Sequence, residues 1–239
     1  MGMLKTVAQA WKVPEIRSKM IFTLLMLVVF RIGSNIPVPN INRSVLSEMF
    51  TGDAGLFDLF DLFSGGSFSN FTIFALSITP YITASIIVQL LSMAFPYFEN
   101  LAKEGMEGRK KMAQITRYLT IVLALIQAIG LYFTLKNGYQ AVTTPGFLAG
   151  ATIVLTFTAG TAFLMWLGEQ INDKGIGNGI SILIFAGIVS RGPQMIQAIV
   201  EYNKSGTLNI FTTIILIVVA VIVIGFVVAM TNAERKISV

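Results

Sequence analysis

Few side chains in this chain could carry out catalysis, because its 239 residues include no histidine and no cysteine. Those two residue types supply most zinc ligands, every disulfide and the general base of a Ser-His-Asp triad. An intramembrane enzyme could use paired carboxylates instead, but the acidic residues lie near the ends of the apolar segments rather than within them. We therefore expect no enzymatic activity, no metal site and no cofactor.

The glycine-rich loop KGIGNGIS, residues 174–181, superficially resembles a phosphate-binding loop. Such a loop binds phosphate only between a strand and the helix of a βαβ unit. The sequence predicts neither that strand before the loop nor a βαβ helix after it. We expect instead a turn in which Asn178 or Gly179 caps the following helix. The flanking carboxylates of Glu169 and Asp173 are expected to pair with the basic loop near residues 103–117 rather than to bind a metal.

The composition indicates that most of the chain is surrounded by lipid. Hydrophobic residues make up 54% of the chain and charged residues 12%, whereas a soluble domain has about 25% charged residues. A hydrocarbon core roughly 30 Å thick needs about 20 apolar residues of helix. Six stretches meet this need, at approximately 20–36, 71–96, 118–135, 146–168, 180–200 and 210–231. The sequence therefore predicts an all-α, polytopic membrane protein with six transmembrane helices.

The basic residues predict the orientation in the membrane. Most of the 17 Lys and Arg residues fall in loops on the same side as the N-terminus, and the exceptions are Arg31, Arg43, Lys136, Arg191 and Lys204. Because basic loops stay in the cytoplasm, we expect a cytoplasmic N-terminus. The basic residues lie between apolar runs and form no stripe with aromatic residues, so no direct nucleic-acid binding is expected.

A short amphipathic helix is predicted at about 56–66, within a long mixed connection between the first two spans. The opposite face from its apolar residues carries Asp58 and Asp61, and it ends at Gly65-Gly66, a pair that permits a helix stop or a hinge. Two turns are too short to span a membrane, so this helix either lies at the interface or packs into the protein. Its apolar face consists of Leu56, Leu59, Phe60 and Phe63.

Pro80 lies inside the predicted second span, where it should kink or break the helix. Hydroxyl side chains around it could satisfy the freed backbone groups or face a partner helix. A secondary transporter of a small solute, with a broken second helix, is one function that fits this pattern. The hydroxyl residues are Ser77, Thr79, Thr83 and Ser85.

Charged residues are scarce within the spans, although ion- and proton-coupled transporters usually keep such residues at mid-membrane. Any pathway through this protein is then controlled by shape and by an apolar constriction, in which a narrow ring of aliphatic residues excludes water and ions. This pattern points away from a selective ion carrier.

Three segments resemble the SecY family of pore subunits of the bacterial Sec protein translocase. They are ITPYITASIIVQLL at 78–91, KEGMEGRKK at 103–111 and LTFTAGTAFLMWLGEQINDKGIGNGISILIFAGIV at 155–189. The resemblance is colinear from about Trp11 to Lys236. Members of the family have ten spans in two halves of five, so the chain is similar to the first half, the sixth span and the start of the next loop. We expect the full protein to continue past Val239.

The resemblance implies a central pore subunit that passes unfolded polypeptides across the cytoplasmic inner membrane and releases membrane helices laterally into lipid. Ile78, Ile82 and Ile184 are similar to members of the aliphatic pore ring. The short helix resembles the plug that closes the pore from outside. The plug residues are Phe57, Leu59, Phe60, Phe63, Gly65 and Gly66.

The second and third spans resemble one wall of the lateral gate, with Thr83, Gln89 and Gln127 as its polar residues. The resemblance also implies a set of partners. They are the SecE and SecG subunits, the SecA ATPase motor, the ribosome, signal sequences, unfolded polypeptide substrates and membrane lipid. Nucleic acid would be met only through ribosome docking.

Overall fold

The computed structural model describes residues 11–42, 61, 64–144, 146–205 and 209–233. Within these ranges the regular structure is helical, with two isolated β-bridges, Pro37 with Thr72 and Ile41 with Val142, and no strand. The predicted all-α fold class is therefore confirmed. The chain divides into two compact units, one ending at Ser190 and the other beginning at Arg191.

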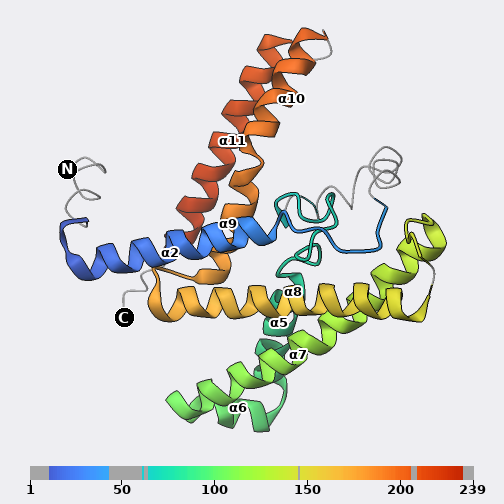
Figure 1. The fold of residues 1–239 in the computed structure, drawn as a ribbon. Coiled ribbons are helices and arrows are strands. Elements are labelled where there is room, and N and C mark those ends of the chain that lie inside the picture. The colour runs from blue at the N-terminus through green and yellow to red at the C-terminus, as the bar shows by residue number, and fades with distance from the viewer. Residues whose placement is uncertain (1–10, 43–60, 62–63, 145, 206–208, 234–239) are drawn as a thin grey trace. The chain divides into compact units, whose positions relative to one another are not determined.

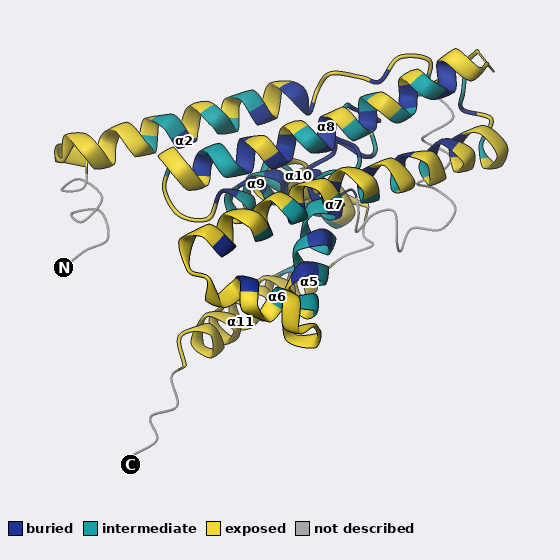
Figure 2. Ribbon diagram, turned by 90° about the horizontal axis from the view of Figure 1, so that it is seen from below, coloured by how far each residue is buried: buried dark blue, intermediate teal, exposed yellow. Residues whose placement is uncertain are grey.

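Two long helices form the frame of the first unit. Helices α7 (Met106–Phe133) and α8 (Phe147–Lys174) pack along each other. Helix α5 (Thr79–Ala94) packs on α7, while α2 (Pro14–Gly33) and α9 (Gly179–Ser190) pack on α8 (Figure 1). Buried residues follow one another along most of α8 (Figure 2), so α8 is the central helix of this unit.

Two clusters of buried apolar side chains make up the core of the first unit. One joins α7 and α8 to the segment around residues 68–75 and contains Val38, Phe68, Phe71, Ala75, Ala128, Tyr132, Leu135, Ala141, Ile153 and Phe157. The other joins α2, α8 and α9 to the start of α5 and contains Phe30, Phe74, Ile78, Leu164, Leu167, Ile171 and Leu183.

The second unit contains α10 (Gly192–Lys204) and α11 (Ile210–Thr231). The two helices are linked by a hydrogen bond of 3.0 Å from Asn203 Nδ2 to Thr213 Oγ1. Helix α11 carries no charged residue, and its large apolar side chains from Phe211 to Met230 are exposed. A helix that is apolar on every side suits a lipid environment.

The structure has fewer membrane-spanning candidates than the six that hydropathy predicts. In its described part, four segments are long and apolar enough: Met106–Gly138, Phe147–Lys174, Gly179–Lys204 and Phe211–Thr231. A fifth exists if the bent pair of α5 and α6 counts as one span. The predicted first span overlaps α2, which is not among them because this 20-residue helix also carries Glu15, Arg17, Lys19 and Arg31.

The predicted second span begins later than expected. Residues 71–78 form turns with positive φ at Phe71 and Ser77, and the helix starts only at Thr79. Pro80 therefore lies in the first turn, where a missing N–H breaks no helical hydrogen bond. The sharp bend is at the other end, where α5 and α6 (Pro96–Lys103) meet at 101° on either side of Phe95.

The turns at 71–78 enter the core because Gly160 of α8 has no side chain. A Cβ atom at Gly160 would lie 1.9 Å from the carbonyl oxygen of Ile73. The same segment is tied to the chain that follows α2 by hydrogen bonds of 3.0 Å from Val38 N to Phe71 O and from Ile73 N to Ile36 O. An apolar stretch can thus be buried without being helical.

We expect Gly160→Ala to lower the free energy of unfolding by about 1–3 kcal/mol, because the new methyl group must displace backbone atoms. Thermal unfolding of the purified full-length protein in detergent measures the change. Gly130→Ala in α7 is the matched control, since a Cβ there meets nothing within 4 Å. Equal melting temperatures for the two variants would contradict the close contact.

Candidate functional site

The three isoleucines that the sequence assigns to the pore ring lie in one apolar cluster. Ile78 is buried in the cluster, with 3% of its surface exposed, while Ile82 and Ile184 pack against it half-buried. Ile78 and Ile82 come from the start of α5, and Ile184 comes from the middle of α9. The fold therefore brings together residues that are about a hundred positions apart in the sequence.

The start of α5 fixes two of these side chains relative to each other. Ile78 is the N-cap residue, and its carbonyl oxygen accepts hydrogen bonds from Tyr81 N at 3.0 Å and Ile82 N at 3.1 Å. Residues four positions apart on a helix share a face. Ile78 and Ile82 therefore face the same cluster one turn apart.

A small cavity separates Ile78 from Ile184. Its volume is about 10 Å³, close to the least that holds one water molecule. Apart from Ser77, all of its lining residues are apolar, so neither an ion nor a solute finds a polar site there. The lining residues are Phe30, Ser77, Ile78, Leu164, Leu183 and Ile184.

The predicted glycine stop at 65–66 is present in the structure. Gly65 and Gly66 have φ of +64° and +89°, a region that side chains disfavour. A Cβ atom on Gly65 would lie 2.7 Å from the Cα atom of Gly187 in α9. The end of the short predicted helix is thus held by backbone contact with α9, one turn beyond Ile184. Its predicted plug residues Phe57, Leu59, Phe60 and Phe63 lie outside the described residues.

Asp61 differs from its expected position on a polar face, since only 2% of its surface is exposed. Its Oδ1 atom accepts hydrogen bonds from Ser69 N at 2.7 Å and from Ser64 Oγ at 3.4 Å. Ser64 Oγ in turn accepts one from Phe68 N at 2.9 Å. Buried N–H groups in the turn would otherwise lack acceptors. The signal that could have found this role is an aspartate and a serine just before paired glycines.

The predicted lateral-gate residues are not brought together as a group. Thr83 is half-buried on α5, and its hydroxyl donates to Thr79 O in its own helix at 3.0 Å. Gln127 is half-buried on α7 and lines a pocket of about 460 Å³ that also includes Thr79. Gln89 is exposed, away from that pocket. All three residues lie on α5 or α7, two helices that pack against each other.

The last turns of α8 and the loop that follows it contain two of the predicted polar contacts. Glu169 pairs with Arg117 of α7 at 2.7 Å, which confirms pairing with the basic segment. The Asn178 side chain accepts a hydrogen bond from Ser181 N at 3.2 Å, which confirms the predicted cap of α9. The described residues hold no group of three or more His, Cys, Asp or Glu side chains that could bind a metal.

Two further contacts of this loop were not predicted. Asn172 Oδ1 accepts a hydrogen bond from Gly179 N at 2.7 Å, and Thr23 Oγ1 of α2 accepts one from Ile176 N at 3.1 Å. Both satisfy backbone donors in a glycine-rich turn. No spacing in the sequence indicates that α2 lies beside this loop.

Comparison with solved structures identifies the architecture. The chain aligns with Sec61 from a canine ribosome–channel complex of the endoplasmic reticulum, with a TM-score of 0.62 and 23% identity, covering 100% of this chain and 54% of that one. A second structure, of a protein-conducting channel, gives a TM-score of 0.60 and 22% identity, covering 99% and 53%. The fold is thus that of about half a protein-conducting channel.

Sequence comparison gives the family. The SecY family model matches residues 72–239. Protein translocase subunits SecY of Bacillus subtilis and Escherichia coli K12 are 48% and 45% identical, over 99% and 94% of this chain and 56% and 52% of their own lengths. The chain belongs to the SecY family and is a multi-pass membrane protein. It spans about half the length of the curated relatives it matches. The alternative of a small-solute transporter finds no support in these comparisons.

We expect Asp61→Ala to weaken the turn at residues 64–69 by about 1–3 kcal/mol, because Ser69 N loses its acceptor inside the protein. Hydrogen exchange of the peptide that covers this turn, read by mass spectrometry on the full-length protein, measures the loss of protection. Asp61→Asn is the matched control, since its amide oxygen can still accept from Ser69 N. Equal protection in wild type and Asp61→Ala would show that the turn does not depend on this side chain.

Proposed function

We propose that this chain is the N-terminal half of the central pore subunit of the Sec protein translocase. It passes unfolded polypeptides across the cytoplasmic inner membrane and releases membrane helices laterally into lipid. The observation that carries this proposal is the meeting of Ile78, Ile82 and Ile184 in one uncharged cluster beside a cavity of about 10 Å³. Membership of the SecY family supports it.

An aliphatic constriction suits a substrate of variable sequence. A passing polypeptide presents every kind of side chain, and a wall without charges or hydrogen-bonding groups holds none of them tightly. The same wall disfavours ions, which lose hydration there without gaining ligands. This subunit then needs no catalytic group, because the work of moving the chain is done by partners.

We assign the segment at 56–66 as the plug. The contact of Gly65 with Gly187 supports this assignment, because it brings the described end of the segment to α9, which also carries Ile184. We assign Thr83, Gln89 and Gln127 to one wall of the lateral gate. The packing of α5 on α7 and the pocket beside Gln127 support that assignment.

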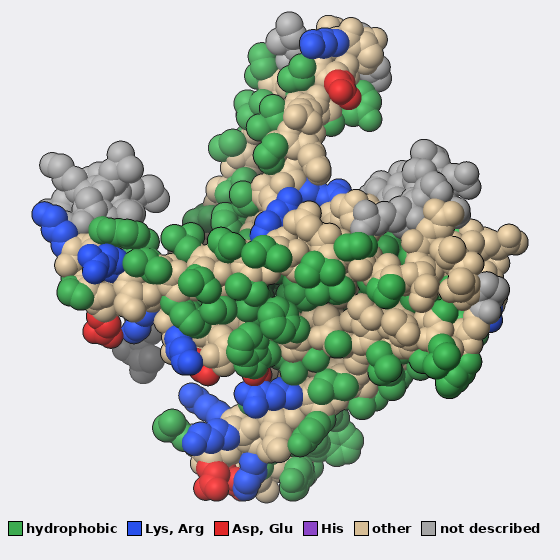
Figure 3. All heavy atoms as spheres, viewed as in Figure 1, with side chains coloured by type: hydrophobic (Ala, Val, Ile, Leu, Met, Phe, Trp, Pro, Cys, Tyr) green, Lys and Arg blue, Asp and Glu red, His purple; other side chains and the backbone are tan. Residues whose placement is uncertain are grey.

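The partners we propose are SecE, SecG, the SecA motor, the ribosome, signal sequences, unfolded polypeptides and lipid. A basic surface at α6 and the start of α7 supports the docking of an acidic partner such as ribosomal RNA (Figure 3). It includes the exposed residues Lys103, Arg109, Lys110 and Lys111. Lys103 pairs with Glu99 and Lys111 with Glu104, so the positive charge comes mainly from Arg109 and Lys110. This basic surface lies on the same side as most of the other basic loops, and both features favour a cytoplasmic N-terminus.

We expect Ile78→Ser, Ile82→Ser and Ile184→Ser together to raise ion leakage through the full-length channel, because hydroxyl groups let water wet the constriction. Single-channel conductance in planar bilayers, with residues 56–66 also deleted, measures the change. Ile86→Ser is the matched control, since Ile86 lies on α5 with 51% of its surface exposed and outside the cluster. Unchanged conductance in the triple variant would overturn the ring assignment.

We expect a photo-crosslinker at Thr83 or Gln89 to capture the signal helix of an arrested precursor, because an opening gate places that helix against α5. Electrophoresis of the crosslinked full-length translocase detects the adduct. A crosslinker at Leu155, exposed on α8, is the control and should capture none. Capture at Leu155 alone would place the exit elsewhere.

A further inference from the structure

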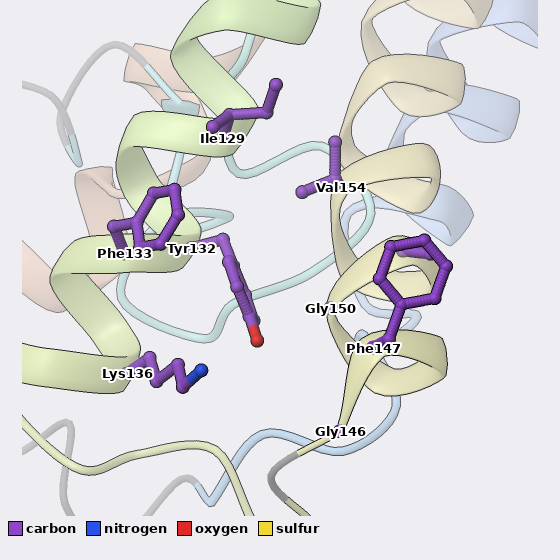
Figure 4. A pocket seen from close by; sticks show the side chains of 9 residues that line it. Ile129, Tyr132, Phe133, Lys136, Gly146, Phe147, Gly150 and Val154 are labelled. Atoms are coloured by element: carbon purple, nitrogen blue, oxygen red, sulfur yellow. The ribbon is translucent and has the colours of Figure 1, made fainter.

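A pocket of about 570 Å³ opens between the end of α7 and the start of α8, apart from the isoleucine cluster. Helix α7 continues there into the π-helical turn η1 (Thr134–Gly138). Two polar side chains, Tyr132 and Lys136, point into the gap between the helices (Figure 4). The remaining lining residues are Ile129, Phe133, Gly146, Phe147, Gly150, Ala151 and Val154.

The Tyr132 hydroxyl is a polar group without a partner in this pocket. Only 9% of the Tyr132 surface is exposed, and no described residue forms a hydrogen bond with its hydroxyl. The ring is held against α8, because a Cβ atom on Gly150 would lie 2.8 Å from the Tyr132 hydroxyl oxygen. The hydroxyl oxygen itself opens into the pocket, so its donor is free to bind a ligand that carries an acceptor oxygen.

Lys136 supplies the positive charge. Its Nζ atom lies 5.9 Å from the centre of the Tyr132 ring, and no carboxylate lines the pocket or pairs with it among the described residues. The N-terminus of α8 borders the same space, and its N-cap residue Gly146 has no side chain to accept from the first N–H groups. An ammonium, a hydroxyl donor and free helix amides together favour an anion such as a phosphate.

The apolar walls and the position of the pocket narrow the choice of anion. Ile129, Phe133 and Val154 provide a hydrocarbon surface that a free phosphate does not need. The pocket lies where the predicted spans 118–135 and 146–168 end and begin, which is the depth of lipid headgroups. A lysine and a hydroxyl donor at that depth can bind the phosphate of a headgroup, here in the leaflet opposite the cytoplasmic N-terminus.

The geometry points to a binding site for an acidic glycerophospholipid. Its phosphate accepts hydrogen bonds from Tyr132 Oη and Lys136 Nζ, and one acyl chain lies along Ile129 and Val154. This inference does not depend on polypeptide transport, so it stands or falls separately from the proposed function.

The test places benzoylphenylalanine at position 147, because Phe147 lines the pocket and is 90% exposed. The full-length protein in its complex is reconstituted in vesicles of equal phosphatidylglycerol and phosphatidylcholine with the same acyl chains. After illumination, mass spectrometry counts the two crosslinked lipids. We expect phosphatidylglycerol to be enriched over its share of the bilayer.

Two variants remove the polar groups one at a time. Lys136→Gln and Tyr132→Phe each remove a hydrogen bond to a charged phosphate, so affinity should fall about tenfold and the enrichment should disappear. Lys204→Gln and Tyr202→Phe are the matched controls, since neither residue lines the pocket. Enrichment that survives in both pocket variants would overturn the site.

Two other outcomes would also overturn it. Crosslinks to protein instead of lipid would show that the rest of the full-length chain or a partner subunit covers the pocket. Loss of the enrichment when inorganic phosphate is added at low millimolar concentration would show that the site binds free phosphate rather than a lipid.

Discussion

The first unit depends on the close approach of backbones that glycine permits. In lipid there is no hydrophobic force between helices, so packing relies on small residues and on satisfied polar groups. Gly160 admits the carbonyl group of Ile73, Gly65 lies against Gly187, and a Cβ atom on Gly179 would lie 2.1 Å from the carbonyl oxygen of Gly168. Non-helical backbone at 64–78 can therefore lie inside the protein, where Asp61 and the chain that follows α2 satisfy part of its hydrogen bonding. Irregular backbone at membrane depth is tolerated only when it is enclosed in this way.

Hydropathy predicted the long helices well, because a run of apolar residues in a membrane must satisfy its own backbone. The segment at 71–78 shows where this reasoning fails. Its residues are as apolar as those of a span, yet Val38, Ile36 and Gly160 provide hydrogen bonds and space for turns. Hydropathy reports the free energy of moving a residue out of water, and it carries no information on the conformation of the backbone.

The candidate site was predictable only in part, because several of its contacts depend on backbone conformation and on packing between distant segments. Glu169 and Asn178 could be assigned because their partners are a basic segment and the helix that follows. Asp61 could not, because its helical spacing from Asp58 predicts the polar face of an amphipathic helix until the turn that it caps is known. The pairing of Ile78 with Ile184 came from family resemblance, since no periodicity links α5 to α9.

The contact between Gly65 and Gly187 also sets how easily the two segments can part. Interlocked side chains must change rotamer or pass one another when an interface opens, and each such step adds to the barrier. Two glycine backbones present smooth surfaces, and their separation forces no rotamer change and sacrifices little dispersion energy. In the plug role that we propose for this segment, such a contact would let the segment leave α9 and return without remodelling that helix.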